Sequence, residues 1–259
     1  MSFFTKRTVT FKLLFLVLLT AVTCYLVSCG EEKKLWRIAY DPLWSPMSLT
    51  GRERNMTGFS NDLMIAIVGA QSSRLELFSS PSAALYVSLD SGVYDGVLGG
   101  LTPDNRSREK YEFSEPFYLL GPVLVVASSS SITSFEDMQG KILGIMSDVN
   151  PVFDVTFYAR IYLKTFQNTV TALESLKNNQ IDGLIMFALP AYSNITALFP
   201  HNLKVVTPPL TQEGLRLIVR KSPLSQEFVA LFNEGLSKLK KEGTYQQLLD
   251  KWGLINTAP

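Results

Sequence analysis

Residues 99 to 118 read GGLTPDNRSREKYEFSEPFY, and the interpretation of the whole chain starts from this stretch. It follows an alternating run, residues 93–97, so Gly99 and Gly100 are expected just past the carboxyl end of a buried strand. Open α/β sheets bind their ligands at that edge. The sequence therefore predicts that this stretch forms one wall of a ligand-binding cleft.

The side chains of this stretch are suited to holding an anion. Glycine at position 100 lets backbone amides approach a ligand, Thr102 adds a hydroxyl, and Arg106 or Arg108 supplies a planar guanidinium that pairs with a carboxylate through two hydrogen bonds. The alternative is that both arginines are solvated loop charges, as arginines beside acidic residues usually are. The residues alone leave both interpretations open.

The composition indicates a folded protein. The chain has 259 residues, of which 46% are hydrophobic and 18% charged, so it can bury a substantial core. Its length allows one large domain or two small ones.

The first 28 residues have the pattern of a secretory signal. Three basic residues precede or enter an apolar run, residues 13–27, that is short for a membrane span. The run ends in Leu-Val-Ser before Cys29, which resembles the bacterial lipobox; Cys29 would then carry lipid and residues 29–34 would form a tether. This predicts a lipid-anchored protein on the periplasmic side of a bacterial cell envelope. An ordinary signal peptide or a single N-terminal anchor is the alternative.

The charge and the cysteine and histidine counts exclude several classes of function. Removing the signal takes away three of the 24 basic residues and none of the 23 acidic ones, which leaves a net charge of −2 and predicts no nucleic-acid partner. The only histidine, His201, follows a predicted helix, so Ser-His-Asp catalysis and a histidine metal site are not expected. The carboxylates of Asp90 and Asp95 fit helix-end and turn roles better than acid-base catalysis. We therefore expect no cofactor and no metal.

The loop after the first strand carries two further candidates. The strand 35–40 runs into Asp41 and then a segment with two prolines, which forbid a helix. Asp41 and Trp44 are expected at the sheet edge, where the indole could lie over a ligand. A buried Trp44 that fills the core is the equally weighted alternative.

The pattern of the remaining chain predicts two α/β sets. Expected strands are 35–40, 74–78, 93–99, 123–127, 142–146, 181–187, 203–206 and 215–219. Expected helices are 58–70 with Ser60 as N-cap, 81–91, 151–165, 169–178, 190–198, 224–239 and 244–252, with one capped turn at 134–138. This order predicts an α/β fold with mainly parallel sheets.

The order of these segments resembles the bacterial extracellular solute-binding proteins of family 3, the polar amino-acid receptors of ABC importers, over about residues 35 to 255. The matching motifs, in chain order, are D-x-x-[YW]-x-P-[FM] at 41–47, G-F-x-x-D-L at 58–63, S-G-x-x-D at 91–95, G-[ML]-T-x-x-x-x-R at 100–106 or 108, F-S-[DE]-P-[FY]-Y at 113–118, S-[LF]-E-D-[LM]-x-G-K at 134–141, A-L-x-x-L-K-N-x-x-[VI]-D-[AG] at 172–183, and D-G-T-Y-x-x-[IL]-x-x-K-W ending at Trp252, with Glu242 in its first place. The set is specific because the matches come in the family's order.

The resemblance implies a two-lobed, periplasmic-binding-protein-like fold of type II with two crossing hinge strands. Lobe 1 would comprise residues 35–120 and 210–255, and lobe 2 residues 121–209. It also implies a monomeric, membrane-tethered receptor that binds a small polar solute, an amino acid or related carboxylate, in the cleft and delivers it to an ABC permease. The alternatives are an enzyme on the same fold, similar to a dehydratase, or a sensory ligand-binding domain.

One departure from the family pattern concerns the ligand's ammonium group. The acid that binds it in the family falls here at Phe187 or Ala188, neither of which carries a charge. Burying an ammonium without a counter-charge costs several kcal/mol. We therefore expect that Asp148, which follows a strand end, or Asp41 across the cleft binds this group; otherwise the solute has no free ammonium and meets Phe187 with an apolar group.

Two further departures concern anion binding. Counting along the motifs places the family's arginine at Ser107, so Arg106 and Arg108 are each one residue away from it. The glycine-threonine loop of lobe 2 reads MSDVN here, residues 146–150. Which arginine takes the role stays open.

Overall fold

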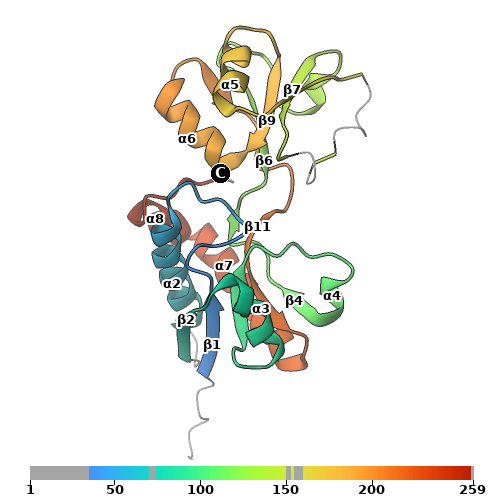
Figure 1. Ribbon diagram of the computed structural model, residues 1–259. Helices are drawn as coiled ribbons and strands as arrows, with labels where there is room; N and C mark the ends of the chain where they lie inside the picture. Colours follow the sequence, from blue (N-terminus) through green and yellow to red (C-terminus); the bar gives the residue numbers. More distant parts are fainter. Residues whose placement is uncertain (1–34, 70–73, 150–152, 155–159, 258–259) are drawn as a thin grey trace, which may run out of the picture. The chain divides into compact units, whose positions relative to one another are not determined.

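The computed structural model describes residues 35–69, 74–149, 153–154 and 160–257 (Figure 1). The predicted signal, the tether and Cys29 lie outside these ranges. Within them, no helix is both long enough and apolar enough to cross a bilayer.

The first sheet combines segments from both ends of the chain. Its strands are β1 (Leu35–Tyr40), β2 (Arg74–Ser79), β3 (Gly96–Gly99), β4 (Tyr111–Phe113), β5 (Tyr118–Leu119) and β11 (Gly214–Arg220). Their order is β2-β1-β3-β11-β4, with β5 also paired to β11. Strand β1 runs parallel to β2 and β3, whereas β11 runs antiparallel to its neighbours. The carboxyl ends of β1 and β3 therefore meet at one edge.

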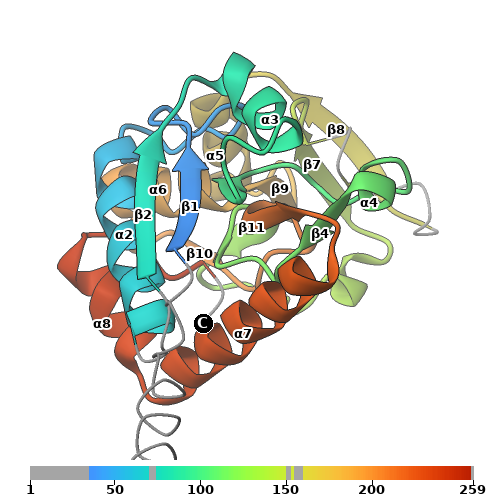
Figure 2. The ribbon, with the colours of Figure 1, turned by 90° about the horizontal axis from the view of Figure 1, so that it is seen from below.

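Helices cover both faces of this sheet because its side chains alternate. The helices are α2 (Glu53–Gly69), α3 (Ser82–Asp90), α4 (Ser107–Lys110), α7 (Pro223–Lys241) and α8 (Thr244–Lys251). Ile38 points to the core cluster that α2, α7 and α8 share on one face (Figure 2). The next residue, Ala39, points to a smaller cluster with Leu85 and Leu89 of α3. This period of two is what a strand buried on both faces requires.

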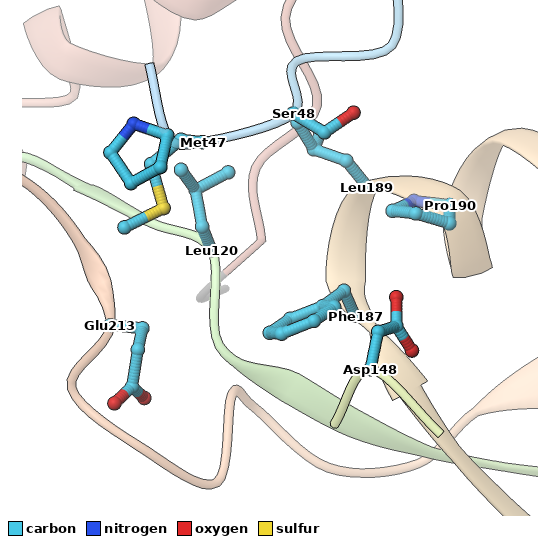
Figure 3. Close-up of a pocket in the computed structure, with 9 residues that line it drawn as sticks. Met47, Ser48, Leu120, Asp148, Phe187, Leu189, Pro190 and Glu213 are labelled. Carbon is cyan, nitrogen blue, oxygen red and sulfur yellow. The ribbon is translucent and has the colours of Figure 1, made fainter. Parts of the chain in front are cut away.

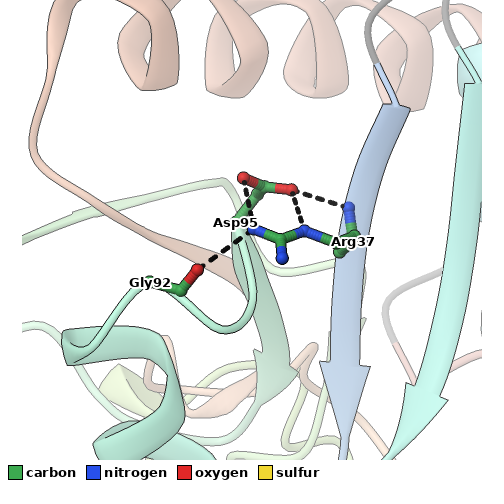
Figure 4. Close-up of polar contacts among 3 residues, drawn as sticks. All are labelled: Arg37, Gly92 and Asp95. Carbon is green, nitrogen blue, oxygen red and sulfur yellow. Dashed lines mark hydrogen bonds and ion pairs between the residues drawn. The ribbon is translucent and has the colours of Figure 1, made fainter.

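The turn before β3 is fixed to β1 by an ion pair. The Oδ2 atom of Asp95 accepts hydrogen bonds from the backbone N–H of Arg37 at 2.9 Å and from its Nε at 3.2 Å (Figure 4). The Nη2 atom of the same guanidinium donates to the carbonyl of Gly92 at 3.0 Å. Asp95 thus has the turn role that the sequence favoured over catalysis.

The second sheet comes from one continuous part of the chain. Its strands are β6 (Pro122–Ala127), β7 (Ile142–Met146), β8 (Tyr162–Phe166), β9 (Gly183–Phe187) and β10 (Leu203–Val205), in the order β10-β6-β9-β7-β8. Strands β8 and β9 run parallel to β7, whereas β6 is antiparallel to β9 and β10. The helices α5 (Thr169–Lys177) and α6 (Ala188–Leu198) and the short 3-10 turn η1 (Glu136–Met138) accompany this sheet. The carboxyl ends of β7 and β9 therefore meet at the same edge.

The predicted α/β class is confirmed, but both sheets are mixed and not mainly parallel, because β11 in the first sheet and β6 in the second run antiparallel to their neighbours. Two local predictions are also wrong. Ser60 does not cap a helix: α2 begins earlier, at Glu53, and Ser60 lies buried within it. The predicted helix 151–165 overlaps β8, because residues 162–166 pair with β7 as an edge strand. The chain connects the two sheets twice, between β5 and β6 and between β10 and β11. The predicted boundaries of the two lobes stay a prediction.

Candidate functional site

A cavity of about 330 Å³ lies among residues from both sheets. It is lined by Pro46, Met47, Ser48, Leu120, Asp148, Phe187, Leu189, Pro190 and Glu213. Pockets for small molecules hold about 300 to 1,000 Å³ and combine an apolar lining with a few polar groups. This cavity has that character, since two carboxylates stand among mostly apolar side chains (Figure 3).

The strand-end rule places Phe187 and Asp148 in this cavity. Phe187 is the last residue of β9, directly before α6, and Asp148 follows the end of the neighbouring parallel strand β7 by two residues. The backbone N–H of Val149 donates to the carbonyl of Met146 at 3.0 Å, and this turn holds Asp148 at the strand end. Both residues were predicted at the cleft, and both line the cavity, with the Asp148 side chain exposed.

Asp41 stabilises the loop that contributes Met47. Its Oδ1 atom accepts from the N–H of Leu43 and its Oδ2 atom from the N–H of Ser45, each at 3.0 Å. The side chain is 4% exposed and does not belong to the cavity lining of the described residues. In this structure Asp41 orders the loop and does not face the solute pocket.

Trp44 is a core residue, which corrects the expectation that it lies over a ligand. It is 1% exposed, and its ring stacks on Tyr40 with centroids 5.7 Å apart. Its Nε1 atom is 3.3 Å from the carbonyl oxygen of Glu53 and 3.3 Å from Oγ1 of Thr57, so the indole N–H has partners inside the protein. Burial of this large ring, with its N–H satisfied, outweighs exposure at the sheet edge.

Gly100 supports the cavity through Met47. A β-carbon at position 100 would lie 2.6 Å from the Cγ and Cε atoms of Met47, so only glycine lets this side chain lie against the backbone after β3. Gly100 therefore leaves room for Met47, which lines the cavity. The expected contact of Gly100 with an anion stays a prediction.

Thr102, Arg106 and Arg108 are exposed on the segment around α4, and the lining of the described cavity does not include them. Ser107, at the family's arginine position, bonds instead with Asp104: its N–H donates to Oδ1 of Asp104 at 2.6 Å, and its Oγ accepts from the Asp104 N–H at 2.9 Å. The hydrogen bond from the Ser107 N–H, aided by the Ser107 side chain, holds the pKa of the Asp104 carboxyl below its usual value.

Glu213 is the cavity residue that the sequence analysis missed. It lies in the connection before β11, where its backbone carbonyl accepts from the N–H groups of Leu120 at 2.8 Å and of Gly121 at 3.2 Å. This segment is the second of the two connections between the sheets, between β10 and β11. The described residues contain no cluster of three or more His, Cys, Asp or Glu side chains that could hold a metal ion.

The comparison with known families identifies the family of this chain. Residues 36–255 match the bacterial extracellular solute-binding proteins, family 3. The chain belongs to this family. The resemblance predicted from the sequence is thereby confirmed.

Individual relatives agree with this assignment. The chain is 23% identical to a probable histidine-binding protein of Neisseria gonorrhoeae, over 85% of this chain and 83% of that protein. It is 25% identical to the ABC transporter arginine-binding protein 1 of Escherichia coli K12, over 92% of this chain and 98% of that protein.

Solved structures share the fold. The L-cystine solute receptor of Neisseria gonorrhoeae, in its unliganded open conformation, matches with a TM-score of 0.65 at 19% identity, over 88% of this chain and 96% of that one. The second substrate-binding domain of GlnP from Lactococcus lactis, also open, matches with a TM-score of 0.59 at 23% identity, over 86% of this chain and 97% of that one. The two-lobed fold class predicted from the sequence is thereby confirmed.

Proposed function

We propose that this protein is the lipid-anchored receptor of an ABC importer and that it binds an amino acid in the cavity lined by Phe187, Asp148 and Glu213. The observation that carries the proposal is the position of this cavity, at the joined carboxyl ends of β7 and β9 in a chain of family 3. Related proteins are described as histidine-, arginine- and L-cystine-binding, which supports an amino acid as the solute.

Each side chain has a proposed role. Asp148 binds the ammonium group of the amino acid, because it follows the end of β7, beside the end of β9 where Phe187 stands in place of the family's acid. Phe187 contacts the apolar part of the solute. Arg106 or Arg108 is the proposed partner of the carboxylate. Asp41 holds the loop that carries Met47.

Thermal unfolding of the protein in the presence of amino acids, short peptides and organic acids tests the proposal. A ligand at 100 times its Kd should raise the free energy of unfolding by about 2.7 kcal/mol. If another class of solute raises the melting temperature and no amino acid does, the assignment of an amino acid as the solute is wrong. Turnover of the bound compound by the purified protein would instead indicate an enzyme on this fold.

Binding of N-acetylated amino acids tests the role of Asp148. Acetylation removes the charge of the ammonium, so the acetylated form of the best ligand should bind at least about tenfold more weakly to the wild type. Asp148→Asn should lose affinity for the free amino acid and should no longer distinguish the two forms. Equal affinity of the wild type for both forms means that no ammonium is recognised.

The lipid anchor is tested on Cys29. If the lipobox interpretation is right, mass spectrometry of the wild type finds a lipid on an N-terminal Cys29, and the Cys29→Ala variant keeps its signal peptide. A Cys29→Ala variant that is still cleaved after Ser28 and still fractionates with membranes would contradict lipidation. In either case the solute pocket is unaffected, since Cys29 precedes the first strand.

A further inference from the structure

The carboxylate of Glu213 lines the cavity, and its Oε2 atom is buried without a hydrogen-bond partner. In the described part of the chain, four buried side-chain polar atoms, including this one, have no hydrogen-bond partner. Three of them belong to one short segment: Oγ1 of Thr211, Oε2 of Glu213 and Nε of Arg216. Buried polar groups are nearly always paired in folded proteins, and an unpaired one costs about 1–3 kcal/mol. Of these three residues, Glu213 is the one that lines the described cavity, so its carboxylate is the group that a bound solute can reach.

The backbone fixes Glu213 in place. Its carbonyl accepts two hydrogen bonds from residues 120 and 121. Two glycines make the close approach possible: a β-carbon at Gly121 would lie 2.6 Å from Oγ1 of Thr211, and one at Gly214 would overlap the carbonyl oxygen of Tyr118. The segment thus lies tightly against residues 118–121. Because the backbone is held, a ligand that binds the carboxylate does not have to order this segment.

No ion pair among the described residues includes this carboxylate, although the guanidinium of Arg216 is near enough to interact with it electrostatically. Arg216, which is 5% exposed, donates its Nη2 to the carbonyl of Gln212. Burial lowers the pKa of Arg216, while the nearby carboxylates of Glu115 and Glu213 act in the opposite direction. The second acid of the cavity, Asp148, adds further negative charge.

The two carboxylates stand on different sides of the cavity. Figure 3 shows Glu213 on the side of Met47 and Leu120, and Asp148 on the side of Phe187, Leu189 and Pro190. The ring of Phe187 projects into the space between the two acids. A solute that fills this cavity therefore meets one acid at each end and apolar groups in the middle. A neutral solute would leave one of the acids without a partner, which is unfavourable in a partly dehydrated pocket.

We propose that Glu213 binds a cationic side-chain group of the solute, so that this pocket selects basic amino acids. The inference rests on the proposed function, in which Asp148 binds the ammonium group. Glu213 then binds the guanidinium or the terminal ammonium, and Phe187 packs on the aliphatic stem between the two charges. Glu213 determines specificity, since it is the group that a neutral amino acid leaves unpaired.

The test is calorimetry with arginine and with citrulline, in which a neutral urea group replaces the guanidinium at nearly the same size. Full-length protein in detergent is used as wild type, as Glu213→Gln and as the control Glu136→Gln, which changes an exposed acid in η1. The wild type and the control should prefer arginine by about 10- to 100-fold, the effect of one charge pair. Glu213→Gln should lose this preference by weakening arginine binding while citrulline binding is kept.

The outcomes separate this inference from the proposed function. Equal binding of arginine and citrulline by the wild type, or unchanged arginine binding by Glu213→Gln, overturns the role of Glu213 but leaves an amino-acid receptor. Binding of agmatine, which is arginine without its carboxylate, in the absence of arginine binding keeps Glu213 and overturns the amino-acid assignment. If the protein binds none of these but binds a neutral amino acid in the thermal screen, the role of Glu213 is overturned and the amino-acid receptor remains; if it binds no amino acid in that screen, both are overturned. If Glu213→Gln does not fold, Glu213→Asp keeps the charge but shortens the side chain, and its arginine affinity should fall while its citrulline affinity does not.

Discussion

The indole ring of Trp252 lies directly against the backbone of Gly58, so closely that a β-carbon at position 58 would overlap the ring. The same indole donates from Nε1 to Oδ2 of Asp62 at 2.8 Å. The carbonyl of Trp252 accepts from Nδ2 of Asn55 at 2.7 Å. Three residues of α2 thus contact Trp252 and hold the C-terminal end of α8 against α2.

Replacing Gly58 tests this contact. Gly58→Ala forces the indole away and should lower the free energy of unfolding by about 1–3 kcal/mol, although alanine is the better helix former. Gly69→Ala, at the end of the same helix, is the matched control, because its β-carbon would meet only one side-chain atom, at 3.9 Å. Urea unfolding of both variants gives the comparison. Equal stability of the two variants would show that the ring moves without cost.

The stability contributed by Asp62 should depend on pH. The hydrogen bond from Lys251, 2.6 Å long, is the main cause that lowers the pKa of Asp62 below its usual value of 3.8, and the bond from Trp252 adds to it. A lowered pKa in the folded state means that the contribution is present above about pH 4 and is lost as the pH falls through the folded value. Asp62→Asn should therefore cost about 1 kcal/mol at pH 7, because Lys251 is 59% exposed and solvent screens the pair, and little once the pH is below the folded pKa of Asp62. Urea unfolding across this range measures the difference, with Glu136→Gln as the control. A gap that stays constant with pH would contradict this role.

The core position of Trp44 predicts a separation of stability from binding. Trp44→Phe removes the hydrogen-bonding N–H and part of the buried volume, so it should lower the free energy of unfolding by about 1–2 kcal/mol. Solute affinity, measured by calorimetry, should change less than about twofold, since an effect below 0.4 kcal/mol is expected from a residue outside the pocket. A tenfold loss of solute affinity with an unchanged free energy of unfolding would show that Trp44 contacts the solute after all.

The arginines around α4 make a prediction that discriminates between them. If one of them binds the solute's carboxylate, either Arg106→Ala or Arg108→Ala should weaken binding by about 3 kcal/mol or more, and the other should have little effect. Calorimetry with the best amino acid measures both variants. Two small losses would mean that another group binds the carboxylate. Both arginines would then be solvated surface charges, in agreement with their exposure.

The position of strand ends in the sequence predicted one of the cavity's two acidic residues, Asp148, but not the other, Glu213. Asp148 was found because it follows the end of an apolar strand, and parallel strands bring such ends together. Phe187 was found because the matching motifs place the family's ammonium-binding acid at this position. Glu213 was missed because it lies between a proline pair and β11, in a segment without a period. Its place depends on backbone contacts with residues 118–121, which are remote in sequence.

Other errors have equally specific causes. Sequence could not orient Trp44, because the direction of a side chain on a loop depends on what packs beneath it, here Tyr40 and the start of α2. The run 162–166 was assigned to a helix because a short mixed run fits both periods, and only its pairing with β7 makes it a strand. The strands 35–40 and 142–146 were predicted with their observed bounds, since each is a buried run between clear breaks.

The position of β11 in the first sheet has a consequence for how the chain folds as it is made. All five strands of the second sheet lie within residues 122–205, so they are complete before β11 leaves the ribosome or the export channel. The first sheet cannot be completed until later, because β11 lies between β3 and β4 and is the last of its strands to be synthesised. Pairings so distant in sequence form slowly. The N-terminal strands are therefore the first to be synthesised, but their sheet is the last to be completed, and the edge of β3 stays unpaired until β11 is made.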